Sequence, residues 1–317
     1  RHRHRLGHRQ LPGTGLAAQR LSGRGDHLRA PGGMHGEVRR RELGHGERSA
    51  APARATRARP AAPAIPVVAA SAPEPTEARC AQASRQAQCS NCHLKDLCLP
   101  CGLEEPDLER LDDLHFGRRR VKAGETLYHA GERFQFVYAV RSGTFKSSLT
   151  LADGREQVSG FHMAGELMGL DGVANGHHAS AATALEDAEV CAIPYAHLSE
   201  LASGSADIQM LMARLMSREI VREHSLMMLL GSMNAEERLA AFLLNLSQRM
   251  KARGYSPSEF HLRMSRAEIG SYLGMKLETV SRTFSAFQQQ RLLEVDKRHI
   301  RILDLDGLTQ AFQSRVH

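Results

Sequence analysis

The chain has 317 residues, a length that allows about two domains, and its 42% hydrophobic and 5% aromatic residues are enough to form a core. No apolar run approaches the ~20 residues that a membrane-spanning helix needs, which argues against a membrane protein. The net charge of +7 is unevenly distributed along the chain. Residues 1–60 hold 14 Arg against 4 acids, residues 61–231 hold 15 basic and 22 acidic side chains, and residues 232–317 hold 13 basic and 9 acidic ones. A nucleic-acid contact is therefore expected at the basic C-terminal end.

Residues 1–78 are rich in Arg, His, Ala, Gly and Pro and show neither helical nor strand periodicity. Such a segment buries too little apolar surface to offset the entropy lost on folding, so we expect it to be disordered or a spurious N-terminal extension. The first residue is Arg and not Met, which favours a reading frame extended upstream of the true start. The alternative is an Arg-rich arm that binds nucleic-acid phosphates.

Residues 79–103 form a cysteine-rich segment with the arrangement C-x2-C-x5-C-x2-C. Thiols packed this closely bind a metal, pair as disulfides or carry out redox chemistry. Their number in a chain of this length does not resemble a disulfide scaffold, and a reducing cytoplasm fits best. Spacing alone would complete a local four-cysteine site of the kind that binds Zn²⁺. The six cysteines are Cys80, Cys89, Cys92, Cys98, Cys101 and Cys191.

Residues 104–205 are predicted to form a small β domain. A short amphipathic helix is expected over residues 103–114, followed by short strands that are separated by glycines. The dipeptide Asp153-Gly154 is a strong hairpin-turn signal. Frequent turn signals between short strands predict an antiparallel β-roll or barrel.

Residues 206–231 are predicted to form one long helix, because apolar residues recur at helical spacing. The stripe is wider than one small barrel needs to cover, which favours a coiled-coil dimerisation helix over a helix that only packs on the core. Within it, Met216 and Ile220 are the predicted dimerisation residues. The whole stripe comprises Ile208, Leu211, Met212, Leu215, Met216, Ile220, Leu226, Leu229 and Leu230.

Residues 232–317 are predicted to form a winged helix-turn-helix. A helix at 234–250 precedes two helices, at 266–273 and 277–291, that are joined by a glycine turn, and residues 292–304 follow as the hairpin wing.

The second helix of this motif has two distinct faces. Glu278, Ser281 and Arg282 share one face at spacings of three and four residues, and they are the candidate DNA-reading residues. The opposite face is expected to pack against the first helix, through Leu277, Val280 and Phe284.

The order β-roll, long helix and winged helix-turn-helix resembles that of the CRP/FNR regulator superfamily. The cysteine cluster and four stretches look like its FNR branch, the oxygen-sensing iron–sulfur regulators: VRSG (140–143), GFHMAGELMG (160–169), NAEERLAAFL (234–243) and EIGSYLGMKLETVSR (268–282). The resemblance covers roughly residues 85–310. It implies an α+β fold with a cyclic-nucleotide-binding-like β-roll, a long dimerisation helix and a C-terminal winged helix-turn-helix.

The resemblance also implies a [4Fe–4S] cluster held by three cysteines of the N-terminal segment and one of the β-roll, which are Cys89, Cys92, Cys98 and Cys191 here. Thiolates are suited to iron–sulfur clusters and to Zn²⁺. Cys80 and Cys101 would then be spare thiols. The alternative is a Zn²⁺-stabilised regulator without an oxygen response, which would use the local four-cysteine site.

In this family such a chain is a cytoplasmic transcription regulator that dimerises without oxygen and controls anaerobic metabolism genes. The E-x-x-S-R pattern resembles that of members that recognise palindromic TTGAT-N4-ATCAA-like double-stranded DNA. Glu223 lies where the family carries a negative charge, usually Asp, that opposes pairing of the homodimer. The loop near Asp153-Gly154 resembles a region that contacts RNA polymerase.

Two functions are not expected. Members that bind cyclic nucleotide present an Arg that holds the phosphate, whereas the equivalent stretch here is His177-His178-Ala179-Ser180. Without that bidentate partner, cyclic nucleotide binding is not expected. The chain also has no P-loop, no nucleophile elbow and no dinucleotide-binding G-x-G-x-x-G, so no enzyme activity is expected.

Overall fold

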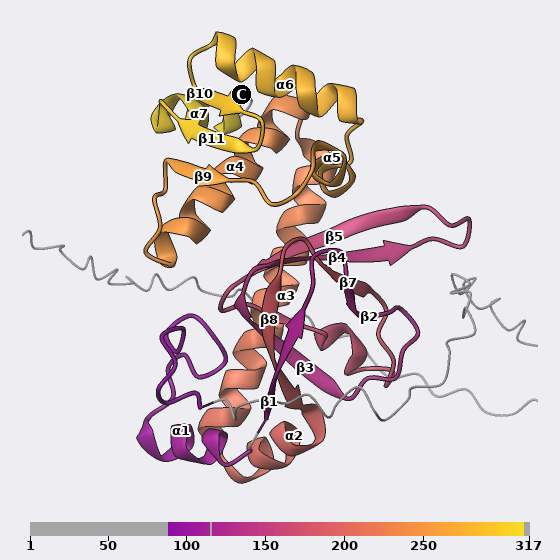
Figure 1. The fold of residues 1–317 in the computed structure, drawn as a ribbon, viewed down its shortest axis with the longest axis vertical. Coiled ribbons are helices and arrows are strands. Elements are labelled where there is room, and N and C mark those ends of the chain that lie inside the picture. Colours follow the sequence, from indigo (N-terminus) through magenta and orange to yellow (C-terminus); the bar gives the residue numbers. More distant parts are fainter. Residues whose placement is uncertain (1–87, 115, 314–317) are drawn as a thin grey trace, which may run out of the picture. The chain divides into compact units, whose positions relative to one another are not determined.

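The computed structural model describes residues 88–114 and 116–313 (Figure 1). Residues 1–78, which are predicted to be disordered or spurious, lie outside this range, and so does Cys80. No helix in the described part of the chain combines the length and the apolar character needed to cross a membrane.

The β-roll consists of two four-stranded antiparallel sheets, with strand orders β1-β8-β3-β6 and β2-β7-β4-β5. The predicted hairpin at Asp153-Gly154 joins β4 to β5, and Gly154 has the positive φ of +83° that this turn requires. The strands are β1 Gly117–Val121, β2 Thr126–Tyr128, β3 Phe136–Ser142, β4 Thr144–Thr150, β5 Glu156–Met163, β6 Leu167–Met168, β7 Ala181–Ala184 and β8 Ala188–Pro194.

Strand β8 separates two apolar cores because its side chains alternate between the faces of its sheet. Val190 and Ala192 pack into the core between the two sheets. Cys191 and Ile193 point to the opposite face and belong to a second core. Three helices, the cysteine segment and residues of β3 and β6 supply most of the rest of this second core, so Cys191 lies on the same side of the sheet as Cys89 and Cys98.

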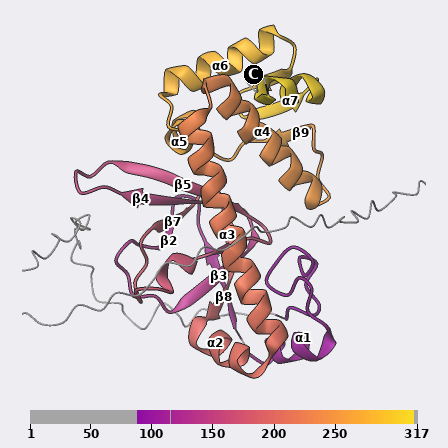
Figure 2. The ribbon, with the colours of Figure 1, turned by 180° about the vertical axis from the view of Figure 1, so that it is seen from behind.

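The helices around the second core are α1 Glu105–Asp112, α2 Tyr195–Gly204 and α3 Ala206–Ser232. Figures 1 and 2 show the cysteine segment and α1 beside α3. Ile208 and Leu211 of α3 are buried there together with Leu99 and Leu111. The sequence predicts α3 well but does not predict α2, which starts after Pro194 without a side-chain cap.

The C-terminal part has the predicted winged helix-turn-helix architecture. Helix α5 has the predicted bounds, because Ser265 and Glu268 form a capping box at its start and Gly274 ends it with a φ of +62°. The strand β9 and the helix α7 are not predicted. The elements are α4 Ala235–Ala252, β9 Glu259–His261, α5 Arg266–Leu273, α6 Leu277–Gln289, β10 Leu293–Asp296, β11 His299–Ile302 and α7 Leu305–Gln313.

A third core joins α4, α5 and α6 to the outer face of β5. Val158, Phe161 and Met163 of β5 share this core with residues such as Leu243 and Phe284. The β4–β5 hairpin therefore contacts the helix-turn-helix directly. The backbone amide of Val158 donates to Ser271 Oγ at 2.9 Å, and Lys146 lies 3.2 Å from Glu268.

The apolar stripe predicted along α3 divides between two faces. Part of it packs within the chain, because Ile208 and Leu211 are buried and Leu229 packs on the third core. A second set of large apolar side chains on α3 is exposed, and of these only Ile220 belongs to the predicted stripe. This set comprises Met210, Ile220, Val221, Met227 and Met228.

Candidate metal centre and DNA-reading helix

The cysteine segment folds as a succession of tight turns. The amide of Cys92 donates to the carbonyl of Cys89 at 3.1 Å, and the amide of Cys101 donates to that of Cys98 at 3.1 Å. The side chain of Asp112, at the end of α1, accepts from the amide of Cys89 and from the Ser90 hydroxyl. These bonds fix the segment to α1 and keep the first cysteine buried.

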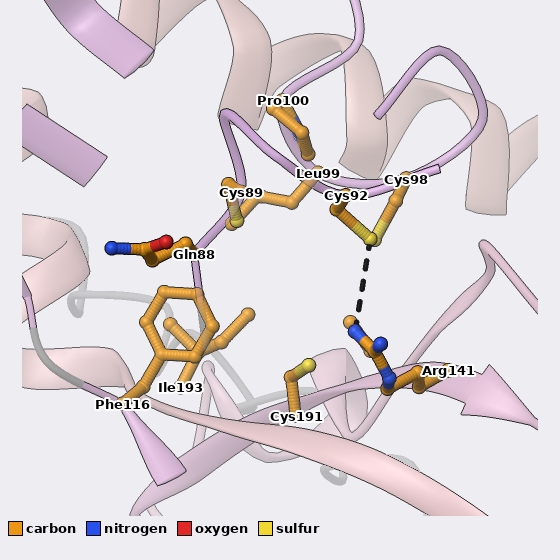
Figure 3. Close-up of a pocket in the computed structure, with 11 residues that line it drawn as sticks. Gln88, Cys89, Cys92, Cys98, Leu99, Pro100, Phe116, Arg141, Cys191 and Ile193 are labelled. Carbon is orange, nitrogen blue, oxygen red and sulfur yellow. Dashed lines mark hydrogen bonds between the residues drawn. The ribbon is translucent and has the colours of Figure 1, made fainter. Parts of the chain in front are cut away.

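Four cysteines line one small cavity, and they are the four that the resemblance implies as ligands: Cys89, Cys92, Cys98 and Cys191. In Figure 3 the first three come from the turn segment on one wall, and Cys191 comes from β8 on the other. Cys101 does not line this cavity. The structure thus groups three near cysteines with the distant one around this cavity.

The remaining wall of the cavity is mostly apolar, formed by residues such as Leu99, Phe116, Ala139 and Ile193. One cation, Arg141, also lines it, and its Nη1 lies 4.0 Å from Cys92 Sγ (Figure 3). Arg141 stands at an irregularity in the pairing of β3 with β8, and its Nε is 2.9 Å from Glu189. Bulges of this kind redirect a side chain next to a functional site. Arg141 lies in VRSG, and no pattern in the sequence predicts its place in this cavity.

Burial controls the ionisation of the cavity thiols. It raises the pKa of Cys98 to about 12 and that of Cys191 to about 11, and it also raises the pKa of Cys89. Neighbouring cysteines raise these values further, because several thiolates would repel one another. Four neighbouring thiolates in an apolar cavity would be unstable without a bound cation. The four cysteines are therefore suited to bind a cationic metal centre.

The described residues contain no group of three or more Cys, His, Asp or Glu side chains placed to share one metal ion. A single Zn²⁺ needs its sulfurs at ~2.3 Å from one point. Four cysteine thiols are a donor set that suits an iron–sulfur centre as well as Zn²⁺.

The candidate DNA-reading residues lie on one exposed face of α6. Glu278, Ser281 and Arg282 are all exposed, whereas Val280 and Phe284 are buried in the third core. The prediction that Leu277 faces the first helix is wrong, since its exposed fraction is 47%. It is the first residue of α6.

The turn between α5 and α6 requires a close backbone approach. The amide of Met275 donates to the carbonyl of Gly270 at 2.8 Å. A Cβ on Gly270 would lie 2.6 Å from the Met275 carbonyl oxygen, so this position needs glycine. The guanidinium of Arg266 lies 3.5 Å above the Phe284 ring and ties the two helices together.

The predicted dimerisation residues occupy different environments on α3. Ile220 is 56% exposed and Glu223 is exposed, while Met216 is half-buried. The exposed apolar side chains at 210, 220 and 227 follow spacings compatible with a heptad seam.

Asp171 makes a set of contacts in the β-roll that the sequence does not predict. Its Oδ2 accepts from the amides of Ala179 and Ser180, at 2.9 and 2.8 Å, and from Ser180 Oγ at 2.8 Å. His178 Nδ1 lies 3.3 Å from Oδ1. Burial alone would raise the pKa of Asp171, but the hydrogen bonds from His178 and Ser180 outweigh it and lower the pKa. No local pattern marks this contact, because the carboxylate and its donors lie in different turns.

Comparisons with known proteins agree with this architecture. The Cyclic nucleotide-binding domain family matches residues 118–205, and the Crp-like helix-turn-helix domain family matches residues 237–311. The transcriptional regulatory protein Btr of Bordetella pertussis is 48% identical over 71% of this chain and 93% of its own length. The fumarate and nitrate reduction regulatory protein of Escherichia coli K12 is 44% identical over 70% of this chain and 89% of its own length.

A solved structure shows the same likeness. FixK2 from Bradyrhizobium japonicum superposes with a TM-score of 0.58 at 30% identity, over 62% of this chain and 96% of that protein. The aligned part of this chain thus shares the fold of FixK2. The chain belongs to the CRP/FNR superfamily of transcription regulators.

Proposed function

We propose that this chain is an oxygen-responsive transcription regulator of anaerobic metabolism genes that holds a [4Fe–4S] cluster through Cys89, Cys92, Cys98 and Cys191. The observation that carries the proposal is the cavity that these cysteines line and that Cys101 does not. The names of two relatives support the physiological part: the Escherichia coli protein regulates fumarate and nitrate reduction, and FnrA of Stutzerimonas stutzeri, 46% identical over 72% of this chain and 93% of its own length, is a transcriptional activator.

When bound, the cluster would supply an oxygen-sensitive centre. The residues of this chain would hold it and control access to it. Leu99, Phe116 and Ile193 keep water from one side, while Arg141 offsets negative charge on the thiolates. Because the thiols of Cys98 and Cys191 have raised pKa values, binding must release protons, and uptake should weaken at low pH.

Occupancy of the cavity would act on dimerisation by linkage. The cysteine segment shares a core with Ile208 and Leu211, so a ligand that orders this segment also orders the first turns of α3. A ligand that binds only the dimer-competent state shifts the equilibrium towards it. We propose residues 79–103 as the cluster-binding segment, 104–205 as the sensor domain, 206–231 as the dimerisation helix and 232–317 as the DNA-binding domain.

The dimer would insert two α6 helices into successive major grooves of a palindromic operator. On each half-site Arg282 would donate two hydrogen bonds to guanine, and Glu278 would accept from cytosine N4. Ser281 would contact thymine or phosphate. RNA polymerase would contact the β4–β5 hairpin near Asp153, which is exposed.

The β-roll would serve as a scaffold and not as a cyclic nucleotide receptor. The Asp171 carboxylate already accepts from the amides of Ala179 and Ser180. A cyclic phosphate that approached these amides would meet a negative charge. The stretch also lacks an arginine that would attract the phosphate. In this role the protein would act in the cytoplasm and would have no enzyme activity.

The test is the iron and sulfide content of anaerobically reconstituted protein, together with its visible absorption spectrum. Wild type and Cys101→Ala should take up equal amounts of iron and sulfide and turn brown, whereas Cys191→Ala should not form a stable chromophore. A colourless wild type that contains zinc, or a Cys101→Ala variant that fails while Cys191→Ala succeeds, would overturn the proposal.

A further inference from the structure

Glu166 lies in the turn between β5 and β6 and is bound by two arginines of the DNA-binding domain. Its Oε1 accepts from Arg249 Nε at 3.0 Å and from Arg253 Nη2 at 2.6 Å, and its Oε2 accepts from Arg249 Nη2 at 2.6 Å. Arg222 of α3 lies 3.9 Å from the same carboxylate. With side-chain exposures of 13% for Glu166 and 7% for Arg253, this contact is largely shielded from water.

The same arginines also bind the backbone on the N-terminal side of Glu166. Arg249 Nη2 donates to the carbonyl of Phe161 at 2.7 Å, and Arg253 Nε donates to that of Ala164 at 2.7 Å. Helix α4 and its C-cap residue therefore hold the turn by side chain and by main chain. We call Glu166, Arg249 and Arg253 the Glu166 clamp.

The other side of this turn contacts the cysteine segment. A Cβ on Gly165 would lie 2.9 Å from Leu97 Cβ, so Leu97 rests on the bare glycine backbone. Leu97 directly precedes Cys98. The glycine also needs its φ of +86° to make the turn.

A second connection runs through β3. The amide of Gly165 donates to the Val140 carbonyl at 2.8 Å, and the amide of Val140 donates to the Glu166 carbonyl at 2.9 Å. The residue after Val140 is Arg141, which lines the cysteine cavity. The turn thus lies between the wall of that cavity and helix α4.

The clamp is a permanent ion pair near neutral pH. Burial alone would raise the pKa of Glu166, but Arg249, Arg222 and Arg253 outweigh it and lower the pKa to about 2. The carboxylate therefore stays ionised, and the clamp changes only when the turn or α4 moves.

We propose that Glu166 is a positioning residue that transmits occupancy of the cysteine cavity to the DNA-binding domain of the same chain. When the segment around Cys98 becomes ordered, Leu97 packs on Gly165 and fixes the position of the turn. The Glu166 clamp then fixes the position of the C-terminal end of α4. This route rests on the proposed function and acts beside dimerisation through α3. It gives Glu166 a role in coupling and none in holding the cavity's ligand.

The first experiment compares operator affinity with and without the cluster in wild type, Glu166→Gln and the control Asp187→Asn. Asp187 is an exposed β-roll carboxylate that pairs with Lys122 at 3.1 Å and touches no residue of the DNA-binding domain in the contacts described. Fluorescence anisotropy on a palindromic operator gives the ratio of the two affinities. In Glu166→Gln that ratio should fall by about tenfold, within the usual range of allosteric coupling, with iron content, sulfide content and dimer mass unchanged. An unchanged ratio would overturn the proposal.

Leu97→Ala tests the other end of the route. It leaves the clamp in place and removes the contact with Gly165, so it should lower the same ratio at normal iron content. Full coupling in Leu97→Ala would show that the signal does not pass through this contact, which contradicts the proposal.

Hydrogen exchange on the iron-free protein separates failure of this inference from failure of the proposed function. Glu166→Gln should speed exchange both at residues 249–253 and at residues 94–98, and Asp187→Asn should speed neither. Faster exchange at the α4 end alone would refute the connection. The proposed function fails if wild type binds no iron, or if it binds operator equally with and without iron. In that case the exchange result alone decides whether the turn connects residues 94–98 with residues 249–253.

Discussion

At the scale of single residues, the Asp171 carboxylate, which accepts three hydrogen bonds from Ala179 and Ser180, has the clearest energetic consequence. Asp171→Ala leaves the amides of Ala179 and Ser180 without their acceptor. Ala179 is exposed, so its amide can bind water, but Ser180 is buried. An unsatisfied buried donor costs about 1–3 kcal/mol, and we expect the free energy of unfolding in urea to fall by that amount through Ser180. Asp153→Ala, which removes an exposed pair with Arg155, should change it by no more than about 0.5 kcal/mol. Equal losses in the two variants would contradict this account of Asp171.

His162 predicts a pH dependence of stability. Burial lowers its pKa from 6.5 to about 3, and Ser147 Oγ lies 3.0 Å from its Nε2. Between these values the unfolded chain binds the proton and the folded one does not, so stability is fully present above pH 6.5 and falls as the pH drops towards 3. The slope attributable to His162 is up to about 1.4 kcal/mol per pH unit.

Urea unfolding at several pH values checks this. His162→Gln should flatten the dependence below pH 6.5, because the variant lacks the titrating ring. His129→Gln, at an exposed position, should keep the wild-type slope. A wild-type slope in His162→Gln would exclude His162 as the cause.

At the scale of elements, α3 exposes more apolar surface than its own domain covers. Ile220 stands in the middle of the exposed set and has no apolar partner among the buried cores described. We expect Ile220→Glu to weaken dimerisation of the reconstituted protein by at least about tenfold, because pairing would bury an unpaired charge. Sedimentation velocity measures this. Leu151→Glu, at an exposed leucine of the β4–β5 hairpin, is the matched control, and equal weakening there would exclude α3 as the seam.

Helix α6 predicts the pattern of operator recognition. Arg282→Ala should lose about 1–3 kcal/mol of binding free energy and relax specificity at one base pair per half-site. Gln289→Ala, near the far end of the helix, should bind as wild type does. Anisotropy titrations against operators substituted one position at a time measure both effects. Uniform loss across all sequences in Arg282→Ala would identify it as a phosphate contact.

The sequence predicts elements whose signals are local. Helix α5 is correct to the residue because Ser265, Glu268 and Gly274 encode both of its ends within ten positions. Helix α2 is missed because no side chain caps its start, and α7 is missed because its glycine weakens the helical signal.

Contacts between distant segments have no local signal. The sequence does not predict the contact between Glu166 and Arg249. These residues are 83 positions apart, and neither the turn around Glu166 nor the helix around Arg249 has a sequence pattern that requires the other. Spacing alone also leaves open whether Cys101 or Cys191 joins the other three cysteines. Only the alternation of side chains along β8 turns Cys191 towards the cysteine segment.

At the scale of the whole molecule, two sets of contacts lead from the cysteine cavity towards the helix-turn-helix, and we propose that both carry its signal. One passes through the core that the cysteine segment shares with α3. The other passes through the Gly165–Glu166 turn to α4. The free energy that either set of contacts can transmit is limited to the difference in contact free energy between the protein with an occupied cavity and the protein with an empty one.

The most direct test of the central claim is an air pulse given to anaerobically reconstituted wild-type protein, with absorbance, dimer mass and operator binding followed together. We predict a brown dimer that binds the operator without oxygen, and in air bleaching with loss of the dimer and of operator binding on the same timescale. A colourless, zinc-containing protein that stays dimeric and operator-bound in air would contradict the account.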